Sequence, residues 1–294
     1  MITVFGSINL DMVIRVADFP RPGETIPTKG FAMSAGGKGA NQALAVRRAG
    51  GDVRMVGLTG KDSHADLALA LLKADGVDLT RTEVCKESTG LAFIQVEDSG
   101  ENTIAIVKGA NGEVSVATAN AALADLGGGD ILLLQQEVPL ASIDRAIDLA
   151  KSAGARSVLN TAPFQEEYIP LARKADVVIS NETEFDALKP GSEPRLERAE
   201  AYAAETGRLL IVTLGADGAM VVEPDKEAVN VPSPKLDKVV DTTGAGDTFC
   251  GYFCKMMADG ADPVTATRMA VKAASLACCK NGAQPSIPFA ADVK

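Results

Sequence analysis

Short apolar runs alternate with helix-compatible stretches through the second half of the chain. The strand-like runs lie in DILLLQQ (130–136), RSVLNT (156–161), DVVISN (176–181) and LLIVTLG (209–215). Between the first two lies LASIDRAIDLAKSAG, whose closing Gly154 is typical of a helix C-terminus. Continuous apolar strands that alternate with helices favour a parallel sheet buried on both faces. The pattern therefore predicts an α/β fold with a mostly parallel central sheet flanked by helices on both faces.

A different pattern interrupts this rhythm in the first half. The segments DMVIRVADF, GETIPTKGFAM and GLAFIQVEDSGENTIAIVKG resemble strands, and DSGEN with Gly100 is typical of a hairpin turn. We expect a small projecting β-sheet inserted into one domain spanning residues 1–294, with strands at about 11–16, 25–33, 91–97 and 102–108. A sheet of few strands needs a partner for its second face. The sheet is therefore predicted to be a lid over a ligand, or a dimer contact.

Composition and charge narrow the classes of partner. Hydrophobic residues make up 46% of the chain and charged residues 23%, as in an ordinary globular protein. The formal net charge of −10 repels polyanions, and no basic stripe appears, so we expect no nucleic-acid partner. The odd number of cysteines, five, shows no CxxC spacing, and no run of about 18 apolar residues occurs. We expect reduced thiols, a cytoplasmic location and no membrane partner.

The segment VVDTTGAGDTFCGYFCKMM places glycines directly before a helix that the apolar spacing starts around Ala245. The amides of Gly244, Ala245 and Gly246 then lie at a helix N-terminus, where unsatisfied N–H groups and the helix dipole favour an anion. Asp247 follows in the first turn. It is either a group with a chemical role beside that anion, or a first-turn acid that stabilises the helix by about 0.3–1 kcal/mol.

Two further polar segments lie at predicted element boundaries. SAGGKGANQ carries Lys38 and Asn41 at the opening of a helix, but it matches neither a Walker A loop nor a GxGxxG fingerprint. This glycine-rich segment would either bind the hydroxyl groups of a ligand or form a capping turn of the helix. SNETEF follows a strand, and its Asn181 and Glu184 would either hold Mg²⁺ through water or form a capping box.

Together the motifs resemble the ribokinase, or PfkB, family of carbohydrate kinases over nearly the whole chain. GGKGANQ and DTTGAGDTF are similar to the two signature segments of that family, and NETE is similar to its magnesium motif. The segments GSINLD, FPRPGET, GENTIAIVKGAN and NGAQPS are similar to those of members that act on ribose. The resemblance implies a ribokinase-like fold and transfer of the γ-phosphoryl group of ATP to the primary hydroxyl of D-ribose. Deoxyribose, a ketohexose or a nucleoside are the alternative acceptors, and a non-catalytic sugar or nucleotide sensor is the alternative class.

The resemblance also assigns roles to individual positions. Asp247 would accept the proton of the sugar hydroxyl, while Gly244, Ala245 and Gly246 neutralise the transferred phosphoryl group. The implied sugar ligands are Asn9, Asp11, Gly37, Lys38, Asn41, Glu137 and Asp247. The implied ATP site is TLGADG (213–218), with Thr213, Gly215 and Gly218, together with Asn181 and Gly246, and Mg²⁺ would lie near Glu184. The chain departs from the family at Val271, where an asparagine often stands near the adenine.

The same resemblance implies a bound monovalent cation, whereas the apolar pattern of the projecting strands implies a dimer. K⁺ would be bound by Asp241, Thr243, Ala277, Lys280, Gly282 and Ser286, several of them through backbone carbonyls. Taken alone, Asp241 would cap a turn and Ser286 would bind water. The projecting strands would form a homodimer, because they carry apolar residues such as Ile94, Ile104 and Ile106.

Overall fold

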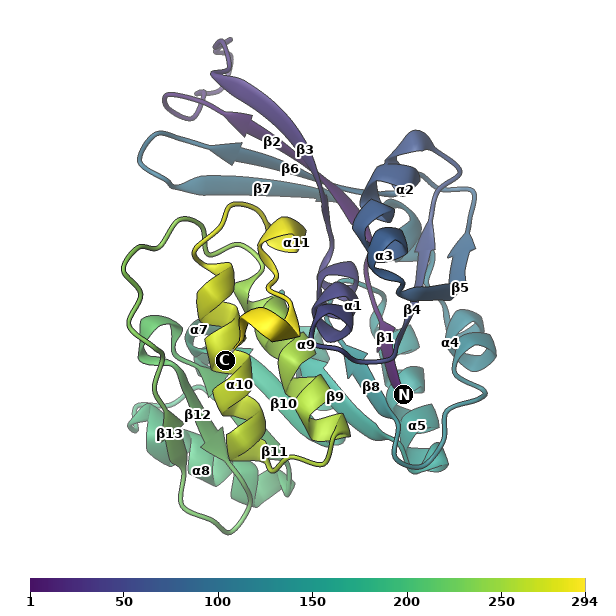
Figure 1. Ribbon diagram of the computed structural model, residues 1–294, viewed down its shortest axis with the longest axis vertical. Helices are drawn as coiled ribbons and strands as arrows, with labels where there is room; N and C mark the ends of the chain where they lie inside the picture. Colours follow the sequence, from purple (N-terminus) through teal and green to yellow (C-terminus); the bar gives the residue numbers. More distant parts are fainter. Residues whose placement is uncertain (294) are drawn as a thin grey trace.

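The computed structural model describes residues 1–293, and its centre is a nine-stranded sheet (Figure 1). The strand order is β13-β12-β11-β10-β9-β8-β1-β4-β5. The strands are β1 (Ile2–Phe5), β4 (Val53–Thr59), β5 (Asp78–Val84), β8 (Ile131–Leu134), β9 (Arg156–Asn160), β10 (Val177–Asn181), β11 (Leu209–Thr213), β12 (Ala219–Val222) and β13 (Val229–Val231). All pair in parallel except β12 and β13, which pair antiparallel at one edge. The predicted mostly parallel sheet is confirmed.

Helices cover both faces of this sheet. The helices are α1 (Lys38–Arg48), α2 (Ser63–Ala68), α3 (Ala70–Asp75), α4 (Val116–Ala122), α5 (Leu140–Ala153), α6 (Ile169–Lys174), α7 (Glu182–Leu188), α8 (Arg195–Thr206), α9 (Ala245–Ala258), α10 (Pro263–Ala277) and α11 (Ala283–Ser286). Short 3₁₀ turns occupy Gly109–Glu113, Glu166–Tyr168, Gly215–Asp217 and Ala290–Asp292. In β8, Ile131 and Leu133 pack with α1, α9 and α10, whereas Leu132 and Leu134 pack with α4 to α8. Burial on both faces explains why the strand runs are apolar throughout.

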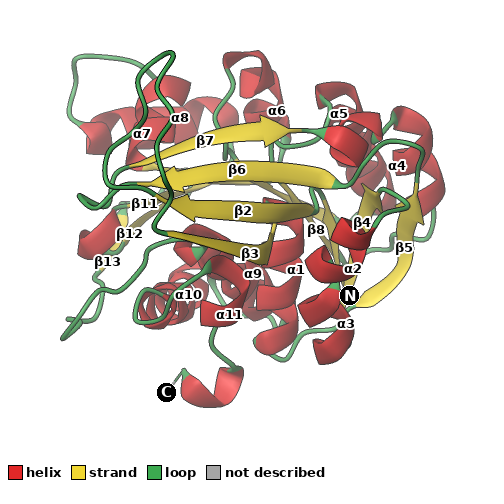
Figure 2. Cartoon of the chain, turned by 90° about the horizontal axis from the view of Figure 1, so that it is seen from above, coloured by secondary structure: helices red, strands yellow, loops and turns green. Residues whose placement is uncertain are grey.

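A second sheet of four strands projects over one end of the domain (Figures 1 and 2). Its order is β3-β2-β6-β7, formed by Gly30–Gly36, Asn9–Arg15, Gly90–Val96 and Asn102–Val107. We call it the lid sheet. The expectation of a strand at 25–33 was wrong in its boundaries, because residues 25–29 form an irregular loop. Pro27 in that loop has no N–H for a strand ladder.

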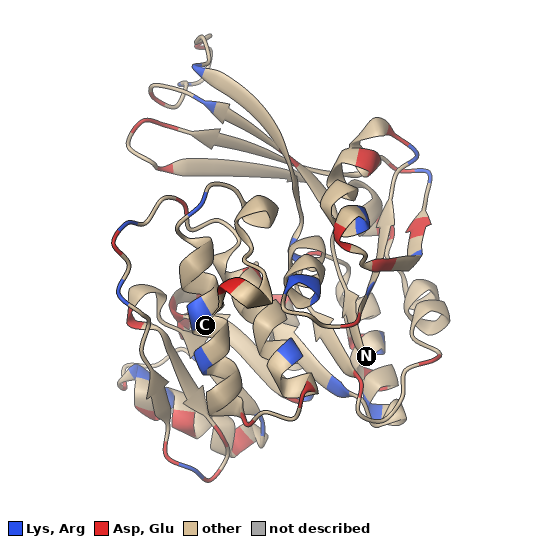
Figure 3. Cartoon of the chain, viewed as in Figure 1, with Lys and Arg blue, Asp and Glu red and all other residues tan. Residues whose placement is uncertain are grey.

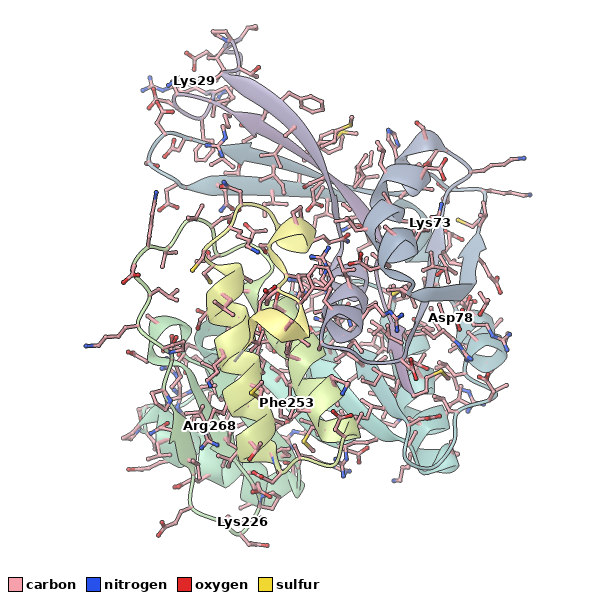
Figure 4. The ribbon with its side chains drawn as sticks, in the orientation of Figure 1. Lys29, Lys73, Asp78, Lys226, Phe253 and Arg268 are labelled. Carbon is pink, nitrogen blue, oxygen red and sulfur yellow. The ribbon has the colours of Figure 1, made fainter. Side chains whose placement is uncertain are left out.

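The lid sheet is apolar and only partly covered. Most of its length is free of charged residues in Figure 3, and the ion pair between Lys29 and Asp98 lies at its tip. Figure 4 labels Lys29 there, far from Phe253 in the helical layer beneath. The residues Ile104 and Ile106 are 55% and 49% exposed.

Within residues 1–293, no helix is both long and apolar enough to cross a membrane.

Candidate active site

The candidate site lies where the carboxyl ends of the parallel strands meet the base of the lid sheet. Gly244 directly precedes α9 with a φ of 77°, a left-handed conformation that favours glycine. A Cβ atom at this position would lie 2.9 Å from the Cα of Ala283. The predicted start of the helix at Ala245 is confirmed, and Asp247 lies buried in its first turn.

The anion site differs in one detail from the expectation. The N–H of Ala245 donates to the carbonyl of Thr242 over 3.2 Å, because the tight turn before α9 directs it there. In contrast, no described residue accepts a hydrogen bond from the amides of Gly244 or Gly246. The expectation that three consecutive amides are all available was therefore wrong for Ala245.

Two amide side chains of α1 hold the carboxylate of Asp247. Asn41 donates from Nδ2 to Oδ2 over 2.9 Å, and Gln42 donates from Nε2 to Oδ1 over 2.9 Å. The Oδ1 atom of Asn41 is buried and has no partner among the described residues. A substrate hydroxyl could donate to that oxygen, which fits the predicted sugar-binding role of Asn41.

Close packing of α1 against α9 brings these amides within reach of Asp247. A Cβ atom on Gly251 would lie 2.4 Å from the Cβ of Ala45 and 2.8 Å from the carbonyl oxygen of Gln42. The glycine is therefore needed for the helices to approach this closely. Sequence reasoning missed both Gln42 and Gly251, although both lie within the two segments that we quoted as motifs.

A second group of polar residues comes from the base of the lid sheet. Asn9 and Asp11 lie on β2. The Asp11 carboxylate lies next to Gly36 of the neighbouring strand β3, where an added Cβ atom would be 2.2 Å from Oδ2 of Asp11. Asn9 accepts at Oδ1 a hydrogen bond of 2.7 Å from Asn111. The Nδ2 atom of Asn9 is thereby directed away from Asn111, a buried residue that sequence reasoning missed.

The loop after β8 and the start of α1 contribute the remaining sugar-side residues. Glu137 accepts at Oε2 from the hydroxyl of Ser7 and, over 3.1 Å, from the backbone N–H of Lys38. Gly37 has a φ of 87°, and a Cβ atom there would lie 2.6 Å from the backbone nitrogen of Asn9. The structure thus brings Asn9, Asp11, Gly37, Lys38, Asn41, Glu137 and Asp247 to one region, as the resemblance implied for a sugar site.

The charges and burial in this region shift the pKa values of Asp11 and Lys38. Burial raises the pKa of Asp11 from 3.8 to about 7, with further increases from Glu137 and Asp247 and a decrease from Lys38. Burial alone would lower the pKa of Lys38, but Asp247 and Glu137 outweigh it and raise the pKa above its ordinary value. Lys38 is therefore charged at neutral pH and offsets part of the negative charge.

The NETE segment forms the capping box that was one of its two interpretations. Asn181 accepts from the N–H of Glu184 over 2.8 Å, and Glu184 Oε2 accepts from the N–H of Asn181 over 3.1 Å. Glu184 Oε2 also accepts from the hydroxyl of Thr161 over 2.8 Å. The hydrogen bonds from Asn181 and Thr161 both use Oε2, so Oε1 remains for the water shell of a cation.

The candidate ATP segment follows β11. Thr213 ends that strand, and its hydroxyl donates to the carbonyl of Ser180 over 3.4 Å, so β11 and β10 end side by side here. Gly215 and Gly218 have φ values of 54° and 97°. Val271 is buried in the core with α9, at the position where the family often has an asparagine.

The two segments predicted to surround K⁺ do lie together. Asp241 accepts from the N–H of Thr243 over 2.9 Å and from the N–H of Gly282 over 2.8 Å. These bonds lower the pKa of Asp241 even though burial opposes the change. Ser286 is buried and donates to the carbonyl of Ala283 over 2.8 Å. The carbonyl of Ala277 accepts from Lys280 N–H over 3.1 Å.

Comparison with known proteins agrees with this geometry. The family model described as pfkB family carbohydrate kinase matches residues 1–290. The chain belongs to the PfkB family of carbohydrate kinases. A ribokinase of Haemophilus influenzae is 37% identical over 98% of this chain and 95% of its own length. A deoxyribokinase of Salmonella typhi is 34% identical with the same two coverages, 98% and 95%.

Solved structures of family members share the fold. An Arabidopsis thaliana ribokinase, complexed with ribose and ATP, superposes with a TM-score of 0.86 at 30% identity, covering 99% of this chain and 96% of that one. As a PfkB kinase, the chain is an ATP-dependent enzyme that phosphorylates a carbohydrate.

Proposed function

We propose that this kinase transfers the γ-phosphoryl group of ATP to the primary (5-) hydroxyl of D-ribose and yields ribose 5-phosphate and ADP. The observation that carries the proposal is the buried carboxylate of Asp247, held by two amides beside the free N–H groups at the start of α9. Full-length similarity to ribokinases supports ribose as the acceptor. Because a deoxyribokinase is almost as similar, 2-deoxyribose is the second candidate.

In the proposed reaction Asp247 accepts the proton of the sugar hydroxyl as its oxygen attacks the γ-phosphorus. The bond between that phosphorus and the β,γ-bridging oxygen breaks, and ADP leaves with the electron pair. The amides of Gly244 and Gly246, at the N-terminus of α9, would stabilise the negative charge that develops on the transferred group. Phosphoryl transfer needs positioning and charge neutralisation more than covalent help.

The sugar is held in this proposal by groups that donate to and accept from hydroxyls. The carboxylates of Asp11 and Glu137 accept, Lys38 donates, and the buried Oδ1 of Asn41 accepts. Gly37 and Asn9 bring backbone and amide groups close to the same region. A set of polar side chains of this kind suits a small free sugar rather than the apolar face of a nucleobase.

Two cations fit the donor sets that the chain provides. Mg²⁺ would be held through water by Glu184 and Asn181 and would neutralise charge on the ATP phosphates when bound. K⁺ would lie between the Asp241 loop and 277–286, with oxygens from Thr243, Ala277, Lys280, Gly282 and Ser286. No described residue outside the helices and strands donates a backbone hydrogen bond to the carbonyls of Thr243 or Lys280, which suits them to a cation. ATP would lie along Thr213, Gly215 and Gly218.

The lid sheet is proposed to close over the sugar and to form a homodimer contact. Its exposed apolar residues include Phe31, Met33, Phe93, Ile104 and Ile106. Asn9 and Asp11 sit at its base, so movement of the sheet would move two sugar ligands. We also retain a cytoplasmic location as a proposal, supported by five free cysteines.

The test is ADP release over ribose, 2-deoxyribose, fructose and a nucleoside, measured for the wild type and for Asp247→Asn. We expect ribose to give the highest kcat/KM and the variant to lose turnover by about 10²–10⁴-fold while still binding ATP. Near-normal turnover of the variant would return Asp247 to the role of a helix-stabilising acid. A higher kcat/KM for 2-deoxyribose than for ribose would change the proposed substrate but would not contradict the proposed role of Asp247.

A further inference from the structure

Gln42 has no access to solvent and makes three hydrogen bonds. It is 0% exposed. Its Nε2 atom donates to Asp247 Oδ1 over 2.9 Å and to Asn160 Oδ1 over 3.1 Å, and its Oε1 atom accepts from Gln135 Nε2 over 2.6 Å. Both N–H groups and the carbonyl are therefore used. Gln42 has no free polar group with which to contact the sugar or ATP.

The orientation of this amide follows from its partners. A carboxylate only accepts hydrogen bonds, so the NH₂ group of Gln42 must face Asp247. The carbonyl of Gln42 then faces Gln135, which must donate. The Oε1 atom of Gln135 points at Gly6, where a Cβ atom would lie only 1.9 Å away. A side chain at position 6 would displace Gln135, so the glycine makes room for this chain of amides.

The chain of amides connects Asp247 to the rigid part of the fold. Gln135 directly follows β8, and Asn160 ends β9. Asn160 is itself fixed by a bond of 3.1 Å from its Nδ2 to the carbonyl of Ile179 in β10. Three adjacent strands of the central sheet therefore position one oxygen of the carboxylate, through a side chain that never meets a substrate.

We propose that Gln42 is a positioning residue for the phosphoryl transfer: held by Gln135 and Asn160, it fixes the side-chain rotamer of Asp247 so that the carboxylate faces the sugar hydroxyl. This inference rests on the proposed role of Asp247 as the base. The contact with Asn41 restrains only the other oxygen, Oδ2. With both oxygens held, the carboxylate cannot rotate about its χ angles without breaking a buried hydrogen bond.

Neutral amides suit this role better than cations would. A lysine or arginine at position 42 would also orient the carboxylate, but a full positive charge would stabilise its ionised form and weaken it as a base. An amide N–H group donates a hydrogen bond in the same geometry but carries no full charge. Loss of Gln42 should therefore affect the chemical step, whereas sugar affinity depends on Asp11, Lys38 and Glu137, which Gln42 does not contact.

The experiment is steady-state kinetics with ribose at saturating MgATP for Gln42→Met and Gln42→Glu. For Gln42→Met we expect kcat to fall by about 10- to 100-fold, the size expected for a misplaced catalytic group, with the KM for ribose changed less than about threefold. For Gln42→Glu two carboxylates would lie within hydrogen-bond distance of each other and share a proton. The acidic limb of the kcat–pH profile should then move upward by at least about one pH unit.

Gln136→Met is the matched control. Gln136 is also buried and hydrogen-bonded, but to the backbone N–H of Gln165 over 3.0 Å and not to the Asp247 network. Its replacement should lower the thermal midpoint as Gln42→Met does, yet keep kcat within about threefold. If Gln42→Met does not fold, Gln135→Met gives the same test in a weaker form, because it removes one of the two side chains that anchor Gln42 and leaves only Asn160. We expect it to lower kcat by about 3- to 10-fold.

Three results would overturn the proposal: near-normal kcat in the Gln42→Met or Gln135→Met variant, an equal loss of kcat in the control, or an unshifted pH profile for Gln42→Glu. Asp247→Asn separates this failure from failure of the proposed function. If Asp247→Asn is inactive and Gln42→Met is normal, only the positioning role is refuted. If Asp247→Asn itself turns over normally, the base has been misidentified.

Discussion

Replacing Asp11 by asparagine should make the ligand-free protein more stable, and more so at high pH. In the folded protein burial, Glu137 and Asp247 raise the pKa of Asp11 from 3.8 to about 7. Between these values the folded state binds a proton that the unfolded state has lost. Stability contributed by this group is therefore fully present below pH 3.8 and declines as the pH rises to about 7. The asparagine variant does not titrate and escapes this decline.

The magnitude follows from the same shift. Each pKa unit corresponds to about 1.4 kcal/mol, so keeping Asp11 ionised above pH 7 costs at most about 4 kcal/mol. Part of this cost is already present at pH 5. Between pH 5 and pH 8 we therefore expect the stability advantage of the variant to grow by about 2 kcal/mol, allowing for solvent screening. For a chain of this size that is a change of about 3 °C in the difference between thermal midpoints.

The assay is thermal unfolding of the wild type and Asp11→Asn at pH 5 and pH 8, without ligands. Asp18→Asn is the control, because Asp18 is exposed on the loop after β2 and its replacement removes the same formal charge. Ribose should raise the midpoint of the wild type but not that of Asp11→Asn, since the variant lacks a proposed sugar ligand. A variant that is destabilised at pH 8, or an advantage equal at both pH values, would refute the reasoning about Asp11.

The remaining predictions concern other parts of the structure. Gly251→Ala should lower the free energy of unfolding by about 1–3 kcal/mol and also lower kcat, because the new Cβ atom would push α1 away from α9. A stable variant with normal kcat would show that the helices can separate without moving Asn41 and Gln42 away from Asp247. Replacing K⁺ by tetramethylammonium at constant ionic strength should reduce turnover, and Asp241→Ala should remove the dependence; equal rates in both salts would exclude the cation site. Light scattering should give twice 30.4 kDa for the wild type and 30.4 kDa for Ile106→Lys, because a charge would lie on the apolar lid; a monomeric wild type with full activity would exclude the dimer.

The parts of the fold that sequence predicted are those whose signal is local. Apolar runs such as 131–134 predict strands because each residue there is buried on one face or the other. Glycines before an apolar helix located the turn at Gly244. The start of β3 was placed five residues early, at 25, because the β-like residues of ETIPT outweighed Pro27.

The missed residues of the site have no local signal. Gln135 and Asn160 are polar residues at strand ends, and many such residues simply face solvent. Their role depends on the order β9-β8-β1 in the sheet and on the approach of α1 to α9. Asn111 is similar, since it lies in a short 3₁₀ turn and reaches Asn9 about a hundred positions earlier in the chain. Contacts of this range appear only when the tertiary structure is known.

The arrangement of charge in the site also explains why the lid sheet carries sugar ligands. Burial, Glu137 and Asp247 raise the cost of ionising Asp11, and Lys38 compensates for only part of it. A hydroxyl-rich sugar offers donors to these carboxylates, so its binding relieves a cost that the empty site bears. Because Asp11 lies on β2 of the lid sheet whereas Asp247 lies on α9, the sugar connects the two units. Sugar binding should therefore favour closure of the lid before phosphoryl transfer, and Asp11→Asn should weaken this coupling while leaving the Asp247 network intact.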